Sequence, residues 1–219
     1  MTTPSFAMFP VDRVLHDTGT RDRIADALRK GDIMVYPTET VYGIGCDAFN
    51  DAALGRIFEI KQRPLNKPLI LLIRDIRMLG ELVNGLPQIA QRLIEAYWPG
   101  PLTMIFRAKP GVSALLTGGS GTIAVRQSPH PFPASLFQAF DHPLVSTSAN
   151  ISSEAPALSI QALPDRITDK VDLIVDAGII QGTPSTVVDV TDGRLVYIRD
   201  GAITKTSIER LLYDRDKTI

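Results

Sequence analysis

Residues 33–45 read IMVYPTETVYGIG, an apolar run that passes abruptly into hydroxyl groups, a carboxylate and glycines. The apolar residues 33–36 predict a short buried strand, which the following proline ends. Thr38, Glu39 and Thr40 then lie at the carboxyl end of this strand, the edge of an open α/β sheet at which ligands bind. The glycines after them allow the backbone to approach a ligand closely. A plain polar turn between two core elements is the alternative interpretation.

Outward from this stretch, helical and strand-like patterns alternate. Apolar residues spaced three and four apart, with capping residues, glycines or prolines at the ends, predict helices. They are a helix from Thr20 to Gly31, one that begins at Asp51, helices over 88–98 and 131–140, and a last helix that begins at Thr206 with Glu209 in a capping box. Short apolar runs predict strands over 33–36, 68–73, 102–107, 122–126, 144–145, 173–177, 186–190 and 195–199.

The order of these elements indicates an α/β domain with a mixed, twisted sheet. The last two strands flank Thr191-Asp192-Gly193, which predicts a hairpin. Residues 151–170 have the weakest pattern and are interpreted as a loop or lid. We expect one domain over residues 1–219, since this length can build one sizeable core.

Composition excludes several classes of protein. The 219 residues are 44% hydrophobic and 21% charged, and Lys+Arg 23 against Asp+Glu 24 leave a net charge of -1, so nucleic-acid binding would need a local basic patch. The single cysteine, Cys46, excludes a disulfide framework and a Cys-based zinc site. The longest apolar run, 69–73, is far too short to span a membrane. No basic residue precedes Arg13, which argues against a secretory signal, so we expect a cytoplasmic protein.

Familiar catalytic motifs are absent or misplaced. Residues 119–124 match the dinucleotide fingerprint G-x-G-x-x-A, but they lead into a predicted strand instead of opening a helix. No phosphate-binding G-x-x-x-x-G-K-[ST] loop occurs, and His16, His130 and His142 lack metal-ligand spacing. The sequence therefore predicts no metal site built by the protein itself.

The segment KQRPLNKP at 61–68 is a candidate polyphosphate site. No Asp or Glu occurs from residue 60 to 74, whereas Lys61, Arg63, Lys67 and Arg74 carry positive charge. Arginine offers a two-pronged donor to phosphate oxygens, and lysine supplies a point charge. On this segment alone, a solvated basic loop without a ligand is an equally good interpretation.

Three further clusters carry hydrogen-bonding side chains at predicted strand ends. The segment STSAN at 146–150 can orient phosphate or ribose, although a capping turn is the simpler interpretation. Arg126 closes an apolar strand and suits either a bound carboxylate or a structural salt bridge. Hydroxyls at 184–189 and Arg199 surround the predicted hairpin.

Taken together, these motifs resemble the YrdC-type family of L-threonylcarbamoyladenylate synthases. The segments that carry the resemblance are YPTETVYGIG, KQRPLNKPL, WPGPLT, TIAVR, STSAN, PSTVVD and IRDG, in family order from residue 36 to 201. The resemblance implies an open, twisted α/β fold with flanking helices and a large concave, positively lined cleft. It also implies that ATP, L-threonine and bicarbonate give threonylcarbamoyl-adenylate, pyrophosphate and water, the first step toward t6A at position 37 of tRNA.

The resemblance also assigns residues to the two substrates. The ATP contacts would be Lys61, Arg63, Lys67, Thr122, Ser148, Asn150 and Arg199. The L-threonine contacts would be Thr40, Arg126, Ser146 and Ser185. Lys61 and Arg63 would be catalytic by neutralising charge, together with Mg²⁺ that arrives with ATP.

This chain departs from the family pattern in three ways. Ser152-Ser153 stands where the family has Ser-Gly, and residues 70–73 are wholly apolar where some members have a histidine that reaches threonine. The chain also resembles the short form, without a C-terminal extension domain. Downstream, the resemblance implies a transferase complex that moves the product onto tRNA.

Two other functions stay open. One is an RNA-binding module that uses the same basic concave face for tRNA or double-stranded RNA, although the net charge of -1 and 6% aromatic residues argue against it. The other is a divergent paralogue with another carbamoylation role, although this chain keeps both the Lys-x-Arg and the Ser-Ala-Asn elements.

Overall fold

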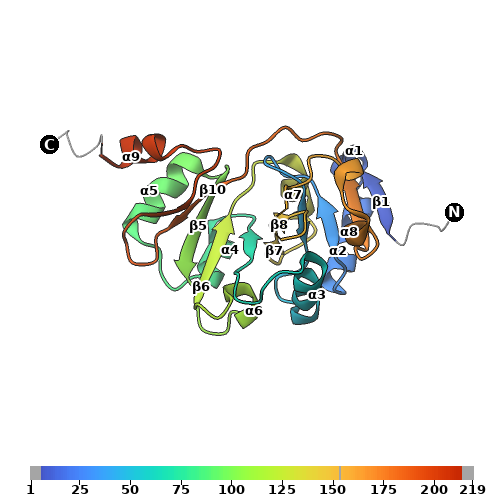
Figure 1. Cartoon of the computed structure of the whole chain (residues 1–219), viewed down its shortest axis with the longest axis horizontal. Helices are drawn as coiled ribbons and strands as arrows, with labels where there is room; N and C mark the ends of the chain where they lie inside the picture. The colour runs from blue at the N-terminus through green and yellow to red at the C-terminus, as the bar shows by residue number, and fades with distance from the viewer. Residues whose placement is uncertain (1–5, 153, 214–219) are drawn as a thin grey trace.

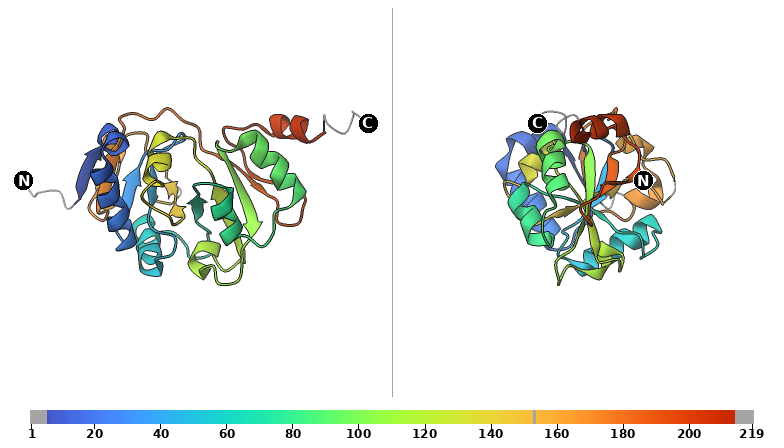
Figure 2. Two further views of the ribbon diagram at one scale, coloured as in Figure 1. Left: turned by 180° about the vertical axis from the view of Figure 1, so that it is seen from behind. Right: turned by 90° about the vertical axis from the view of Figure 1, so that its left-hand side faces the viewer.

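A computed structural model describes residues 6–152 and 154–213. Its strands form two mixed sheets with helices packed around them (Figures 1 and 2). The expected α/β class with a mixed sheet and flanking helices is therefore confirmed, but the strands are divided between two sheets instead of one.

The first sheet has the strand order β1-β9-β2-β3-β8. Its strands are β1 (Ala7–Pro10), β2 (Met34–Tyr36), β3 (Gly43–Gly45), β8 (Thr147–Ser148) and β9 (Leu173–Asp176). β2 runs parallel to β9 and antiparallel to β3, so the quoted stretch 33–45 makes a strand, a loop and a returning strand at the centre of this sheet.

The second sheet has the strand order β11-β10-β5-β6-β4-β7. Its strands are β4 (Ile70–Leu72), β5 (Leu102–Arg107), β6 (Thr122–Arg126), β7 (Leu144–Val145), β10 (Thr186–Asp189) and β11 (Val196–Arg199). β10 and β11 are antiparallel, as the predicted hairpin requires.

The two sheets meet where one short segment serves both of them. β7 pairs with β4 of the second sheet, and two residues later β8 pairs with β3 of the first. Only Ser146 separates β7 from β8. Gly45 allows β3 to lie directly against Val145, because a Cβ at this position would lie only 1.7 Å from the Val145 carbonyl oxygen. We call this crossing, residues 145–147 against Gly45, the sheet junction.

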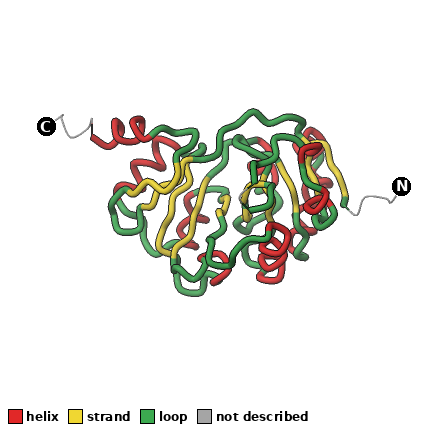
Figure 3. Tube along the Cα trace, in the orientation of Figure 1, coloured by secondary structure: helices red, strands yellow, loops and turns green. Residues whose placement is uncertain are grey.

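The helices cover the sheets on the outside. They are α1 (Val11–His16), α2 (Thr18–Arg29), α3 (Asp51–Lys61), α4 (Ile76–Leu82), α5 (Gln88–Tyr97), α6 (Ala114–Thr117), α7 (Pro131–Leu136), α8 (Asp165–Thr168) and α9 (Lys205–Tyr213), with a 3₁₀ turn η1 at Ile160–Ala162. α1, α2 and α8 lie near the first sheet, whereas α5 lies beside β5 of the second and α9 packs against α5 (Figures 1 and 3). Among the described residues no helix has the length and apolar character to cross a membrane.

Several predicted boundaries shift for local reasons. The helix expected from Thr20 begins at Thr18, because the Asp17 carboxylate accepts from Gly19 N–H and caps it. The last helix begins at Lys205, not Thr206, because Thr204 Oγ1 accepts from Ser207 N–H. The helix expected over 131–140 ends at Leu136. The segment 151–170, expected as a loop or lid, contains η1 and α8.

A single continuous core spans both sheets. Tyr36 and Tyr42 of the first sheet region and Phe106 of the second are fully buried in it, as is Phe132 of α7. The segment 177–185 runs from β9 across one rim of the molecule to β10 (orange in Figure 1). Core and rim segment together hold the two sheets against each other around the junction.

Candidate functional site

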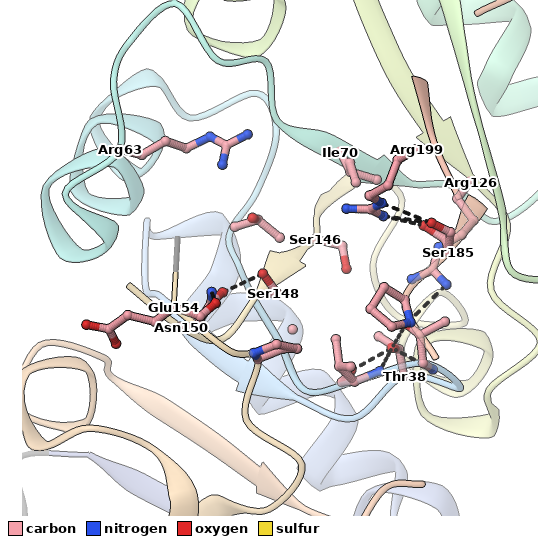
Figure 4. A pocket seen from close by; sticks show the side chains of 16 residues that line it. Thr38, Arg63, Ile70, Arg126, Ser146, Ser148, Asn150, Glu154, Ser185 and Arg199 are labelled. Atoms are coloured by element: carbon pink, nitrogen blue, oxygen red, sulfur yellow. Dashed lines mark hydrogen bonds between the residues drawn. The ribbon is translucent and has the colours of Figure 1, made fainter. Parts of the chain in front are cut away.

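A cavity of about 270 Å³ opens at the sheet junction (Figure 4). It is lined mostly by polar side chains from strand ends and loops of both sheets. The lining residues are Thr38, Thr40, Val41, Gly43, Arg63, Ile70, Arg126, Ser146, Thr147, Ser148, Asn150, Glu154, Pro156, Pro184, Ser185 and Arg199. Its position at the carboxyl end of β2 is the one predicted for a ligand.

The loop after β2 is stiffened by its own side chains. Thr38 Oγ1 accepts hydrogen bonds from the N–H groups of Thr40 and Val41 and lies 2.9 Å from Thr40 Oγ1. The rim segment presses on this loop at Gly182, where a Cβ would lie 2.0 Å from the Thr40 carbonyl oxygen. Both threonines are buried, so Thr40 presents a fixed hydroxyl to the cavity.

Arg126 ends β6 at the cavity wall, and its side chain is only 5% exposed. Its Nη1 donates to the Glu39 carboxylate and lies 3.5 Å from Thr40 Oγ1. Its Nε is buried and has no hydrogen-bond partner among residues 6–152 and 154–213. Burial lowers the pKa of Arg126, an effect that the nearby Glu39 opposes. Of the two partners that the sequence left open, the salt bridge is present, and the unpartnered Nε leaves donor capacity for a ligand.

A second arginine lies on the same wall. Arg199 Nη2 donates to the backbone oxygen of Ser185 at 2.8 Å and to its Oγ at 3.1 Å. Ser185 Oγ in turn lies 2.8 Å from Thr103 Oγ1. Burial and the neighbouring charge of Arg126 lower the pKa of Arg199. The two guanidinium groups therefore act on one region of the cavity.

Arg63 reaches the cavity from the basic segment after α3. Gln62 adopts a left-handed conformation, with φ of 49°, and reverses the chain. Arg63 then closes its own loop, because Nε donates to the Lys67 oxygen at 3.2 Å and Nη2 to the Pro68 oxygen at 2.8 Å. The guanidinium is thus held in place while it lines the cavity.

Lys61 is placed differently from what its predicted contact with ATP suggested. The side chain is 1% exposed and does not line the cavity. Its Nζ donates to the backbone oxygens of Ser148 and Asn150, at 2.5 and 2.7 Å, and to Asn150 Oδ1 at 3.2 Å. An ammonium has three donors, so these three acceptors use all of them. Burial, and to a lesser extent Arg63, lowers the pKa of Lys61 to about 7.

The turn above Lys61 presents Ser148 and Asn150 to the cavity. Ser148 Oγ donates to Asn150 Oδ1 at 2.5 Å, and Asn150 Nδ2 donates to the Glu154 backbone oxygen at 2.6 Å. Lys61, Ser148 and Asn150, far apart in the sequence, therefore form one hydrogen-bonded unit.

The cavity brings together most of the predicted site residues. Those that line it are Arg63, Ser148, Asn150, Arg199, Thr40, Arg126, Ser146 and Ser185. Lys67 is exposed on the basic loop, and Thr122 lies at the opposite end of β6 from Arg126, with Oγ1 2.8 Å from Ser120 Oγ. Thr122 and Arg126 are four residue steps apart along the strand, roughly 13 Å. Contact of Lys67 and Thr122 with ATP stays a prediction.

Sequence reasoning did not assign roles to Thr38, Glu39 or Ser128. All three belong to the polar network around Arg126. The signal for the first two was their place in the stretch 33–45, directly after the buried strand. Nothing local marked Ser128, because its contact with Glu39 joins segments far apart in the chain.

Comparisons with known proteins give consistent results. Residues 26–201 match the family model Sua5_yciO_yrdC, described as "Telomere recombination". A curated threonylcarbamoyl-AMP synthase from Pyrococcus abyssi is 35% identical over 189 residues, which are 86% of this chain and 56% of that protein. The chain thus spans little more than half the length of that relative.

Solved structures share the fold. The crystal structure of P. abyssi Sua5 complexed with L-threonine matches with a TM-score of 0.84 and 34% identity, over 89% of this chain and 58% of that one. The crystal structure of E. coli YciO matches with a TM-score of 0.78 and 30% identity, over 87% of this chain and 93% of that one.

Proposed function

Because the chain belongs to the Sua5/YciO/YrdC family, we propose that it makes threonylcarbamoyl-AMP and pyrophosphate from ATP, L-threonine and bicarbonate. The observation that carries the proposal is Arg126, buried in the cavity wall with an unpartnered Nε. Such a group suits a substrate carboxylate, and the P. abyssi Sua5 of similar fold is described as complexed with L-threonine.

The charge of the cavity fits the proposed reactants. Arg63, Arg126 and Arg199 line it, whereas the acidic lining residue Glu154 pairs with Arg166. Surrounding positive charge disfavours the ammonium form of a bound amino acid and favours the neutral amine. The neutral amine is the form that can combine with carbon dioxide derived from bicarbonate to give a carbamate.

The following step is transfer of adenylate. A carbamate oxygen attacks the α-phosphorus of ATP, the bond to the β-phosphate bridging oxygen breaks, and pyrophosphate leaves. Such transfer depends on positioning and on neutralising charge more than on a protein nucleophile. Arg63 lines the cavity and would neutralise phosphate charge, and Lys61 holds the turn that presents Ser148 and Asn150.

Mg²⁺ would enter this reaction with the nucleotide. Within the described part of the chain no three His, Cys, Asp or Glu side chains form a group that could hold a metal ion. Glu154, which lines the cavity, and Glu39, the partner of Arg126, are both paired with arginines. These residues fit an ion bound mainly by phosphate oxygens and water, as is usual for Mg²⁺ with ATP.

Pyrophosphate release tests the proposal. With ATP and Mg²⁺, release should require both L-threonine and bicarbonate. Arg63→Ala should lower it about 100-fold or more, because a fixed charge at the transferring phosphate is lost. The control Arg107→Ala, which removes an exposed arginine paired with Asp192, should leave release unchanged.

Other outcomes would favour the alternatives. ATP binding without release that depends on the co-substrates would favour a divergent paralogue. tRNA binding that weakens steeply with salt, without affinity for ATP, would favour the RNA-binding module. We further propose that the product passes to a tRNA-modifying transferase complex, the consumer that the family resemblance implies.

A further inference from the structure

Glu39 is the acidic partner of Arg126 and has no role in the reaction as proposed above. Its Oε1 accepts from Arg126 Nη1, and its Oε2 accepts from Ser128 Oγ at 2.5 Å. The Glu39 side chain is 17% exposed and the Arg126 side chain 5% exposed. Both oxygens of Glu39 are therefore fixed by residues at the end of β6 and just after it, with little access to water.

The ion pair leaves one edge of the Arg126 guanidinium for a ligand. A guanidinium carries its donors in one plane, and a carboxylate can accept two parallel hydrogen bonds from adjacent nitrogens. Glu39 takes Nη1, whereas the buried Nε has no partner in the described part of the chain. The edge formed by Nε and Nη2 is thus the one that can hold a second carboxylate.

We propose that Glu39 is a positioning residue that orients the Arg126 guanidinium so that its Nε–Nη2 edge receives the carboxylate of the amino-acid substrate. This inference rests on the proposed function. Glu39 itself does not line the cavity, so it acts through Arg126 and not on the substrate.

Glu39 could instead weaken substrate binding by competing for Arg126. A second positive charge, that of Arg199, opposes this competition. Arg199 lies on the same wall and is close enough to Arg126 for the two charges to interact. With the substrate bound, two guanidinium groups face two carboxylates. Glu39 accepts from Nη1 and leaves the Nε–Nη2 edge for the substrate, so both carboxylates can bind Arg126 together.

Calorimetric titration with L-threonine tests the inference. Glu39→Gln keeps the shape of the side chain but removes its charge, and should weaken threonine binding about 10- to 100-fold through misorientation of Arg126. Ser128→Ala removes the hydroxyl that holds Glu39 Oε2, together with the hydrogen bond that this hydroxyl accepts from His130 N–H, and should weaken threonine binding several-fold. The control Asp192→Asn breaks the exposed ion pair between Arg107 and Asp192, in the turn between β10 and β11, and should leave threonine affinity unchanged.

Two further measurements separate positioning from a purely structural role. In steady-state kinetics Glu39→Gln should raise the KM for threonine while kcat and the KM for ATP change little. In an Arg126→Lys background, where the two-pronged edge is already lost, Glu39→Gln should have a much smaller effect on threonine binding.

The outcomes are distinct. If the wild-type protein binds no threonine, the proposed function fails and the inference fails with it. If the wild type binds threonine and folded Glu39→Gln binds it equally well or more tightly, only the inference is overturned. If Glu39→Gln does not fold, unchanged threonine affinity in Ser128→Ala overturns the inference.

Discussion

At the scale of single residues, Lys61 makes the stability of the protein depend on pH. Its pKa in the folded protein is about 7, whereas an exposed lysine titrates near 10.5. Between these values the unfolded chain binds the extra proton, so the free energy of unfolding rises with pH through this window, by at most ~1.4 kcal/mol per pH unit. Denaturant unfolding at pH 7 to 10 should show a steeper rise for the wild type than for Lys61→Met.

The comparison with Lys61→Met is needed because other groups titrate in the same range. Burial raises the pKa of Tyr36 and Cys46, which makes the folded protein less stable as pH rises. These contributions are common to both proteins and cancel in the difference. Parallel pH profiles for wild type and variant would show that Lys61 has an ordinary pKa.

At the scale of secondary-structure elements, Gly45 allows β3 to approach β7. Gly45→Ala would place a Cβ 1.7 Å from a backbone oxygen that belongs to the other sheet, so the strands must separate. We expect a loss of about 1–3 kcal/mol in the free energy of unfolding, measured by urea denaturation. Gly55→Ala, inside α3, is the matched control, since no atom of the described residues lies within 4 Å of the added Cβ, and it should stabilise by about 0.5–1 kcal/mol. Equal effects of the two substitutions would contradict close packing at the junction.

The elements also show what sequence could and could not predict. The strands expected over 102–107 and 122–126 are found with these bounds, because a continuous apolar pattern marks a buried strand. β3, with two glycines in three residues, and β8, with two polar residues, have no such pattern, and they become strands by pairing, β3 with β2 and β8, and β8 with β3. The division into two sheets follows from these unmarked strands, so it was not predicted.

The candidate site was predictable for a similar reason. Motif position marked Thr40, Ser148 and Arg126 as polar groups after apolar strands, and the cavity brings them together. The partners within the site were not predictable, because Glu39 and Arg126 are 87 residues apart in the sequence. Likewise, no spacing rule shows that Lys61 would donate to backbone oxygens instead of facing the cavity.

At the scale of the whole molecule, the cavity draws its lining from both sheets, so a ligand bound there should stabilise them together. If L-threonine binds the folded state and not the unfolded chain, a concentration 100 times its Kd stabilises the protein by about 2.7 kcal/mol. This raises Tm by roughly 5–10 °C for a chain of this size. Calorimetry should show one transition before and after addition. Two transitions, or hydrogen-exchange protection confined to one sheet, would contradict a single cooperative unit.

The crossing at Ser146 constrains the length of the chain. Leu71 is in register with Val145 in one sheet, and Ile44 with Thr147 in the other, so the spacing between the two pairs is fixed at two residues. An inserted or deleted residue here would shift one strand by one position and turn its side chains to the opposite face. Natural variants should therefore tolerate insertions in surface loops but keep this spacing unchanged. An engineered one-residue insertion after Val145 should abolish folding, whereas an insertion after Gly193, in the turn between β10 and β11, should not.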